Sequence, residues 1–165
     1  MVHRLHFTND TRSALATALG RGILDAQEPD LLGSATAWTG YLALVLSGGE
    51  ILAFSVDSVS AESDDPREEY FRLAAEMRST LPRIRRWPEG PMCPWRVAQR
   101  VAGVVGAKVE TATVLTSATL RGGCDVGVRL PMSNGYTLDL LGEHSGPPQT
   151  LGVEMTHSKG GGHGV

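Results

Sequence analysis

The pattern of apolar and polar residues predicts a β-hairpin over residues 41–59. Residues 41–46 are almost all apolar, and residues 50–59 alternate, with Leu52 and Phe54 on one face and polar side chains mostly on the other. Between the two stretches, Gly48-Gly49 supplies the positive φ angles that a tight hairpin turn needs. The two predicted strands must therefore be antiparallel, with one face buried and one exposed to water.

A second group of strands is predicted in the C-terminal third of the chain. Asn134-Gly135 is the strongest short hairpin signal, and Gly122-Gly123 predicts a further turn. The alternation of apolar and polar residues on either side of these turns indicates half-buried strands. The strands expected outside the first hairpin cover residues 2–7, 108–120, 126–130, 136–141 and 151–155.

Three segments carry helical patterns. Asn9-Asp10-Thr11 offers an N-cap for a helix that runs to residue 19. The clearest pattern covers residues 66–81, where Asp65, Pro66 and Glu68 form a helix start and apolar residues recur at helical spacing up to Pro82. A third helix is expected over residues 94–105, which would begin at Pro94 and end at Gly106.

The order of these elements favours an α+β fold. We expect a mostly antiparallel sheet, built from hairpins and a C-terminal meander, with about three helices packed on one face. The chain of 165 residues has the length of one domain, which we assign to residues 1–156. Residues 157–165 are rich in glycine and histidine and are expected to form a flexible tail.

Composition and charge narrow the class of protein. The hydrophobic content of 41% and charged content of 20% are typical of a globular domain. A net charge of −3 argues against a general nucleic-acid binder. The sequence contains neither a signal peptide nor an apolar stretch long enough to cross a membrane, so a cytoplasmic location is expected. Arginine outnumbers lysine by 13 to 2, which is typical of a GC-rich genome and points to a bacterial source.

The cysteines and histidines predict neither a metal centre nor a bound cofactor. Cys93 and Cys124 are not part of a C-x-x-C spacing, so neither a zinc site nor a redox pair is expected. Cys93 lies at the predicted start of the third helix, where the helix dipole would lower a thiol pKa, and it is the candidate reactive thiol. His144 is a candidate base from a loop, but its distance from Cys93 cannot be read from sequence.

The segment from Arg83 to Trp95 is the candidate binding region. Arginine and tryptophan are enriched at the energetic centres of protein interfaces, and the same pair suits anionic ligands. Acidic residues dominate residues 50–70, whereas arginines dominate residues 71–100. The candidate binding residues are Arg83, Arg85, Arg86, Trp87 and Trp95.

Three classes of function remain open. The sequence contains no compact catalytic motif, so we favour a non-enzymatic domain that binds a protein partner, such as an inhibitor or immunity-type protein that masks another protein. The second hypothesis is a small enzyme or anion-binding protein, with a polar site formed by Cys93, Arg85, Arg86 and His144. The third is a self-associating protein, because unpaired edge strands invite pairing between copies.

Overall fold

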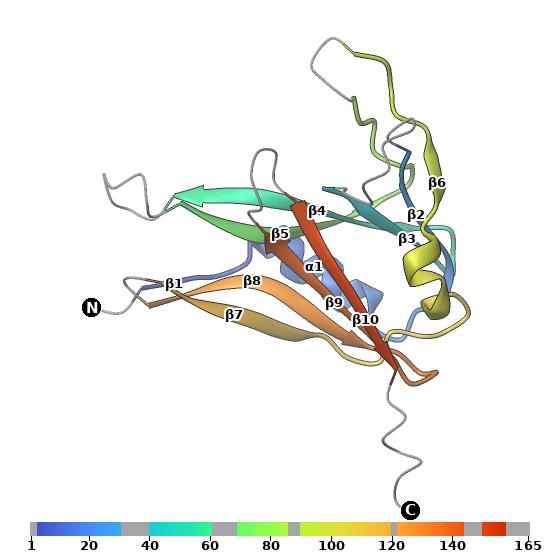
Figure 1. The fold of residues 1–165 in the computed structure, drawn as a ribbon. Helices are drawn as coiled ribbons and strands as arrows, with labels where there is room; N and C mark the ends of the chain where they lie inside the picture. The colour runs from blue at the N-terminus through green and yellow to red at the C-terminus, as the bar shows by residue number, and fades with distance from the viewer. Residues whose placement is uncertain are drawn as a thin grey trace, which may run out of the picture.

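The protein consists of strands with two helices among the described residues (Figure 1). A computed structural model describes residues 3–30, 40–60, 69–85, 90–119, 122–143 and 150–157. The elements in chain order are β1 (His3–Leu5), α1 (Asn9–Ala18), β2 (Ile23–Pro29), β3 (Leu42–Leu46), β4 (Ile51–Ser60), β5 (Glu69–Arg78), β6 (Trp95–Val97), the 3-10 helix η2 (Gln99–Val104), β7 (Thr113–Thr119), β8 (Gly122–Pro131), β9 (Tyr136–Glu143) and β10 (Thr150–His157).

The strands form two five-stranded sheets. The first has the order β5-β4-β3-β2-β6, and all of its pairs are antiparallel. The second has the order β1-β8-β9-β10, with β7 also paired to β8. Its β1–β8 pair is parallel, and its other pairs are antiparallel. Figure 1 shows the two sheets facing each other, with β4 and β5 above β8 and β9.

Strand β8 organises the second sheet. One of its edges pairs along most of its length with β7. Its other edge pairs first with β1, at residues 122–124, and then with β9, at residues 127–131. Asp125 lies at the break between β1 and β9. The pairing with β7 shifts register there, because Val126 is an extra residue on the β8 side.

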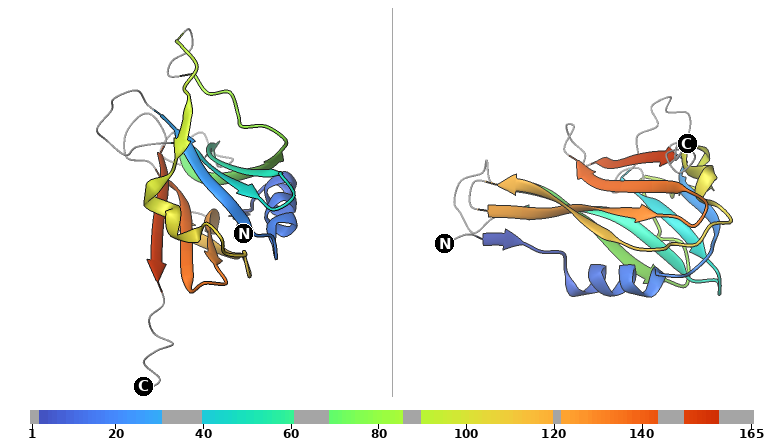
Figure 2. Two further views of the ribbon diagram at one scale, coloured as in Figure 1. Left: turned by 90° about the vertical axis from the view of Figure 1, so that its right-hand side faces the viewer. Right: turned by 90° about the horizontal axis from the view of Figure 1, so that it is seen from below.

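The core lies between the two sheets. Phe54 and Leu73 of the first sheet and Leu130, Leu138 and Leu140 of the second are at most 1% exposed. Burying one such side chain stabilises the fold by about 1.5–3 kcal/mol. Helix α1 lies along β5 (Figure 2) and adds the buried side chains of Ala14, Leu15 and Ala18 to the same core.

Two of the three predicted turns are confirmed. β3 and β4 pair antiparallel around Gly48 and Gly49, whose φ angles are 99° and 88°. β8 and β9 are joined through Asn134 and Gly135, and Gly135 has a φ of 90°. The first helix is confirmed as α1, but its N-cap is Thr8, whose hydroxyl accepts from the Thr11 backbone N–H at 3.2 Å.

The predicted helix over residues 66–81 is wrong where the structure describes it. Residues 69–78 form β5, which pairs with β4 over its whole length. Leu73 and Ala75 are buried and Glu76 is exposed, which is the alternation of a strand. The sequence predicts a helix instead, because the other apolar residues of this segment recur at helical spacing. The predicted cap residues Asp65, Pro66 and Glu68 lie outside the described residues.

The predicted helix over residues 94–105 is also largely wrong. Residues 95–97 form β6, and only the short η2 is helical. The Ala98 N–H donates to the Ala26 carbonyl at 2.8 Å and the Gly106 N–H to the Ile23 carbonyl at 2.8 Å, so this segment is tied to β2 at both ends. Gly106 does have the positive φ expected of a terminating glycine, at 91°.

The sheet-rich α+β class is confirmed, but the described strands form two facing sheets rather than one sheet with helices on one face, and the described residues form two helices rather than about three. Gly122 and Gly123 are the first residues of β8 and not a turn. Strand β2 was not anticipated. His157 ends β10, with its ring 4.5 Å from that of Tyr136, and residues 158–165 of the expected tail lie outside the described residues. Neither helix in the described part of the chain is long and apolar enough to cross a membrane.

Candidate functional site

The predicted binding segment forms an arm that projects from the first sheet. We use "the arm" for residues 79–85 and 90–98, which lead from β5 to β6 and on to η2. The arm rises away from both sheets in two perpendicular views (Figures 1 and 2). It is rooted at β6, which pairs antiparallel with β2.

Hydrogen bonds between its two halves hold the arm in shape. Arg85 and Met92 form an antiparallel bridge, and the Cys93 N–H donates to the Ile84 carbonyl at 2.8 Å. The Trp95 indole N–H donates to the Pro82 carbonyl at 3.0 Å. The arm is therefore an ordered projection in the described residues, and a partner would meet a preformed surface.

The outer surface of the arm combines cationic and apolar side chains. Arg83 and Arg85 are exposed, and Arg85 donates to the Gly90 carbonyl at 2.9 Å. Met92 is 38% exposed and Val97 is 47% exposed, so the arm presents apolar surface as well as positive charge. Of the predicted binding residues, Arg86 and Trp87 lie outside the described residues.

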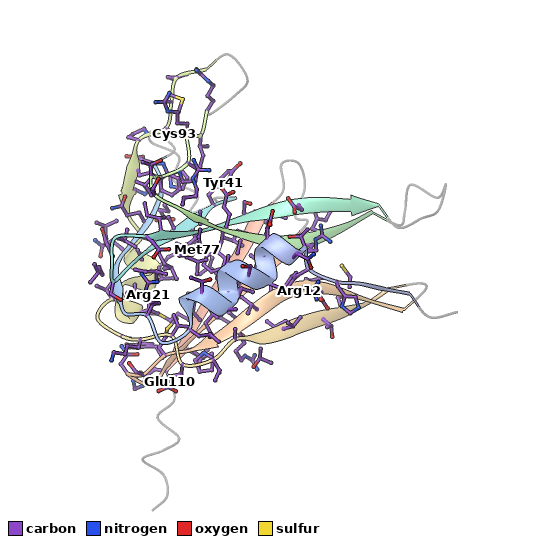
Figure 3. The ribbon with its side chains drawn as sticks, turned by 180° about the vertical axis from the view of Figure 1, so that it is seen from behind. Arg12, Arg21, Tyr41, Met77, Cys93 and Glu110 are labelled. Carbon is purple, nitrogen blue, oxygen red and sulfur yellow. The ribbon has the colours of Figure 1, made fainter. Side chains whose placement is uncertain are left out.

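Trp95 and Cys93 have inner positions on the arm. The Trp95 side chain is half-buried. Its indole N–H donates to the Pro82 carbonyl within the arm, and this hydrogen bond fixes the position of the ring. Cys93 is a free thiol with 5% exposure (Figure 3). The predicted activation of Cys93 by a helix dipole is wrong, because β6 follows Cys93 and η2 begins only at Gln99. His144, its candidate base, lies outside the described residues.

An ion-pair cluster lies at the root of the arm. The Glu28 side chain of β2 is 8% exposed and lies between two arginines. Its carboxylate oxygens are 3.6 Å from Arg96 Nε and 3.5 Å from Arg100 Nε, and Arg96 also reaches Asp30 at 3.6 Å. A buried carboxylate needs such compensation, because removing a charge from water costs several kcal/mol. The cluster therefore fixes η2 and β6 against β2.

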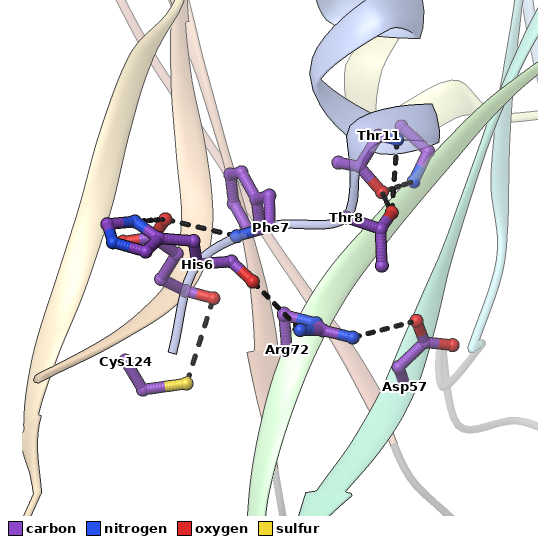
Figure 4. Close-up of polar contacts among 9 residues, drawn as sticks. His6, Phe7, Thr8, Thr11, Asp57, Arg72 and Cys124 are labelled. Carbon is purple, nitrogen blue, oxygen red and sulfur yellow. Dashed lines mark hydrogen bonds and ion pairs between the residues drawn. The ribbon is translucent and has the colours of Figure 1, made fainter. Parts of the chain in front are cut away.

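A second polar cluster, which sequence reasoning missed, joins the two sheets near α1 (Figure 4). Asp125 of β8 accepts from the Phe7 backbone N–H at 3.1 Å, and His6 Nδ1 is 3.5 Å from the same carboxylate. From the facing sheet, Arg72 donates to the His6 carbonyl at 2.9 Å and pairs with Asp57 at 3.7 Å. These contacts hold the chain where it crosses from β1 to α1.

The second cluster contains a buried carboxylate, and a buried thiol lies beside it. Asp125 is 3% exposed. In the sequence it is only an acidic residue between Gly123 and Gly127, within a stretch of alternating apolar and polar residues, and this pattern does not reveal its role. Cys124, next to it, is completely buried, and this burial raises the pKa of its thiol, against the opposing effect of the Arg72 charge. The neutral thiol is therefore favoured, which makes Cys124 a poor nucleophile.

A cleft of about 420 Å³ lies between α1 and the β4–β5 hairpin. Three carboxylates line it, from Asp10, Glu50 and Glu76, together with Met77, which Figure 3 places beside α1. Arg21 pairs with Glu50 at 3.2 Å and Arg78 with Glu76 at 2.9 Å, so protein groups already compensate two of these charges. Within the described residues, no group of three or more histidine, cysteine, aspartate or glutamate side chains is arranged to hold a metal ion.

Comparison with known proteins gives no relative from which a role could be transferred. No protein-family model matches the chain, and neither a curated protein nor a solved structure is significantly similar to it.

Proposed function

We propose that this protein is a non-enzymatic partner-binding domain that uses the arm to contact another protein. The observation that carries the proposal is an ordered projection that exposes Arg83, Arg85 and the apolar Met92 together. Interface centres combine arginines with large apolar side chains, since each provides a large contact area or several donors. The partner surface would be acidic with an apolar pocket.

The proposal favours a protein partner over a nucleic acid for two reasons. The net charge of −3 opposes the long-range attraction that phosphate backbones require. Trp95 is the only aromatic side chain among the described residues of the arm, and it is half-buried, so this part of the arm lacks the row of aromatic platforms on which successive bases stack. A projecting arm of this kind suits an inhibitor or immunity-type protein, whose arm would cover the active site of the protein it binds.

The test begins with the full chain as bait, followed by titration of the captured protein in purified form. We expect a complex of defined stoichiometry that Arg83→Glu and Met92→Asp each weaken by at least about tenfold. Arg12→Glu is the matched control for Arg83→Glu, because Arg12 is also exposed, lies on α1 away from the arm, and undergoes the same charge change. Loss of the captured protein's own activity in the complex would support the inhibitor form of the proposal.

Two results would count against this function. One is the absence of any stoichiometric complex with the full chain. The other is a complex that both arm variants form as tightly as the Arg12→Glu control does, because the contact would then lie elsewhere on the molecule.

A further inference from the structure

Strand β7 is an open edge of the second sheet. Within the described residues it pairs only with β8, and no backbone hydrogen bond joins its outer edge to another segment. In Figure 1 it lies below β8, on the side of β8 that faces away from β4 and β5. Its sequence, Thr-Val-Leu-Thr-Ser-Ala-Thr over residues 113–119, contains neither charge, proline nor glycine. Such an edge presents unpaired N–H and C=O groups and is a template for another strand.

The edge of the first sheet at β5 is protected in two ways. Helix α1 runs along β5, and the Thr11 hydroxyl accepts from the Ala75 backbone N–H at 3.2 Å, which satisfies one outward donor. Arg72, Glu76 and Arg78 also place charges on this strand. Both are devices by which sheet proteins prevent the pairing of edges.

The other edge strands of the two sheets are protected because they are short or carry charged side chains. β1 and β6 have three residues each, and β6 contains Arg96. β10 is longer, but Glu154 and His157 are exposed on it. Among the described strands, β7 is therefore the edge that combines seven residues with a complete lack of charge.

The register shift between β7 and β8 does not disturb the outer edge of β7. Leu115 and Thr116 are consecutive in β7, yet they pair with Gly127 and Asp125, so the extra residue is Val126 of β8. The β7 backbone itself keeps a regular register, and its outer side stays suited to a partner strand. Val114 is 40% exposed on this strand, and Thr113, Thr116 and Ser117 are exposed as well.

We propose that β7 pairs antiparallel with β7 of a second copy of this chain, so that two copies form a dimer with one continuous sheet. A two-fold axis at Thr116 would place each Thr116 beside its counterpart and Val114 beside Ala118 of the second copy. An uncharged strand is compatible with itself in this arrangement, whereas most charged strands would place like charges together. The association stops at the dimer, because each copy has one β7 edge and that edge is occupied in the pair.

The test is the mass of the full chain in solution, measured by sedimentation equilibrium across a concentration series. The weight-average mass should rise from 17.6 kDa towards twice that value with increasing concentration. Thr116→Lys and Thr116→Glu should each weaken association by roughly 100-fold, because like charges would face each other at the axis. An equimolar mixture of the two variants should associate again, as opposite charges then meet.

The control is Thr156→Lys, which adds the same charge at an exposed position on another edge strand, β10, and should leave association unchanged. Far-ultraviolet circular dichroism establishes that each variant is folded, and Thr116→Arg, which places the same charge at the axis, replaces Thr116→Lys if the latter does not fold. The proposal is overturned if the wild-type chain stays a monomer at all concentrations. It is also overturned if folded β7 variants associate like the wild type, or if the mixed variants remain monomeric.

Discussion

Gly127 lies where β8 changes from pairing with β1 to pairing with β9. It is paired with Leu141, and the neighbouring β9 backbone passes very close to it. A Cβ atom at Gly127 would lie 2.1 Å from the Leu140 carbonyl oxygen and 2.6 Å from a methyl carbon of Leu141. Ordinary carbon–oxygen contacts begin at about 3.3 Å, so an alanine here must push β9 away from β8.

The cost of Gly127→Ala can be estimated from what has to move. The atom in the way is backbone, which cannot rotate aside as a flexible side chain can. Overpacking of this kind costs typically about 1–3 kcal/mol, and the loss of one β8–β9 hydrogen bond adds about 1 kcal/mol. We therefore expect a loss of about 3 kcal/mol, which is a large part of the stability of an ordinary domain.

The assay is the free energy of unfolding from urea titrations of both proteins. Gly123→Ala is the matched control, because it makes the same change in the same strand, and its Cβ would meet only the Ser117 carbonyl at 3.7 Å. This control should be neutral or stabilise by up to about 0.5 kcal/mol, since alanine loses less chain entropy than glycine. A loss below about 1 kcal/mol for Gly127→Ala would refute the close approach of β8 and β9.

Two further predictions concern the arm and Cys124. Trp95→Phe removes the hydrogen bond to the Pro82 carbonyl, which is worth about 1 kcal/mol. The arm should then open more often, and trypsin should cleave after Arg83 or Arg85 roughly fivefold faster. An unchanged cleavage rate in the folded protein would contradict the anchoring role of Trp95. Burial raises the pKa of Cys124 in the folded protein, so the thiol loses its proton at lower pH in the unfolded chain than in the folded one. The neutral thiol therefore contributes to stability below its ordinary pKa, and this contribution is lost as the pH rises through the folded-state pKa. Wild-type stability should thus fall relative to Cys124→Ala between about pH 7 and about pH 10 in urea titrations, and a constant difference would show that the thiol is not perturbed.

The hairpins could be predicted because their turns are encoded locally. Gly48-Gly49 and Asn134-Gly135 supply the backbone conformations of their turns, regardless of what the sheets later pack against. The N-terminal helix has the same local basis, although the Thr8 hydroxyl, one residue before the expected cap, satisfies the orphan N–H of Thr11.

The candidate site was predictable as a segment but not as a shape. The density of arginine and tryptophan indicates a binding segment at residues 83–95. Its projection, however, depends on β6 pairing with β2, and β2 has no clear pattern in the sequence. The cluster of His6, Asp125 and Arg72 joins residues from three distant parts of the chain. No spacing along the sequence could reveal it, because its members meet only when the sheets pack.

The sequence by itself determined the sheet-rich character of the protein, its main turns and the alternation of buried and exposed positions, since these depend on neighbours a few residues apart. Tertiary structure decided the rest. Residues 69–78 have good helix formers and an apolar spacing that fits a helix, but a ten-residue ladder with β4 and the burial of Leu73 outweigh propensities of a few tenths of a kcal/mol per residue. The arm and the open β7 edge are likewise set by which strands pair, and strand pairing depends on contacts between residues that lie far apart in the sequence.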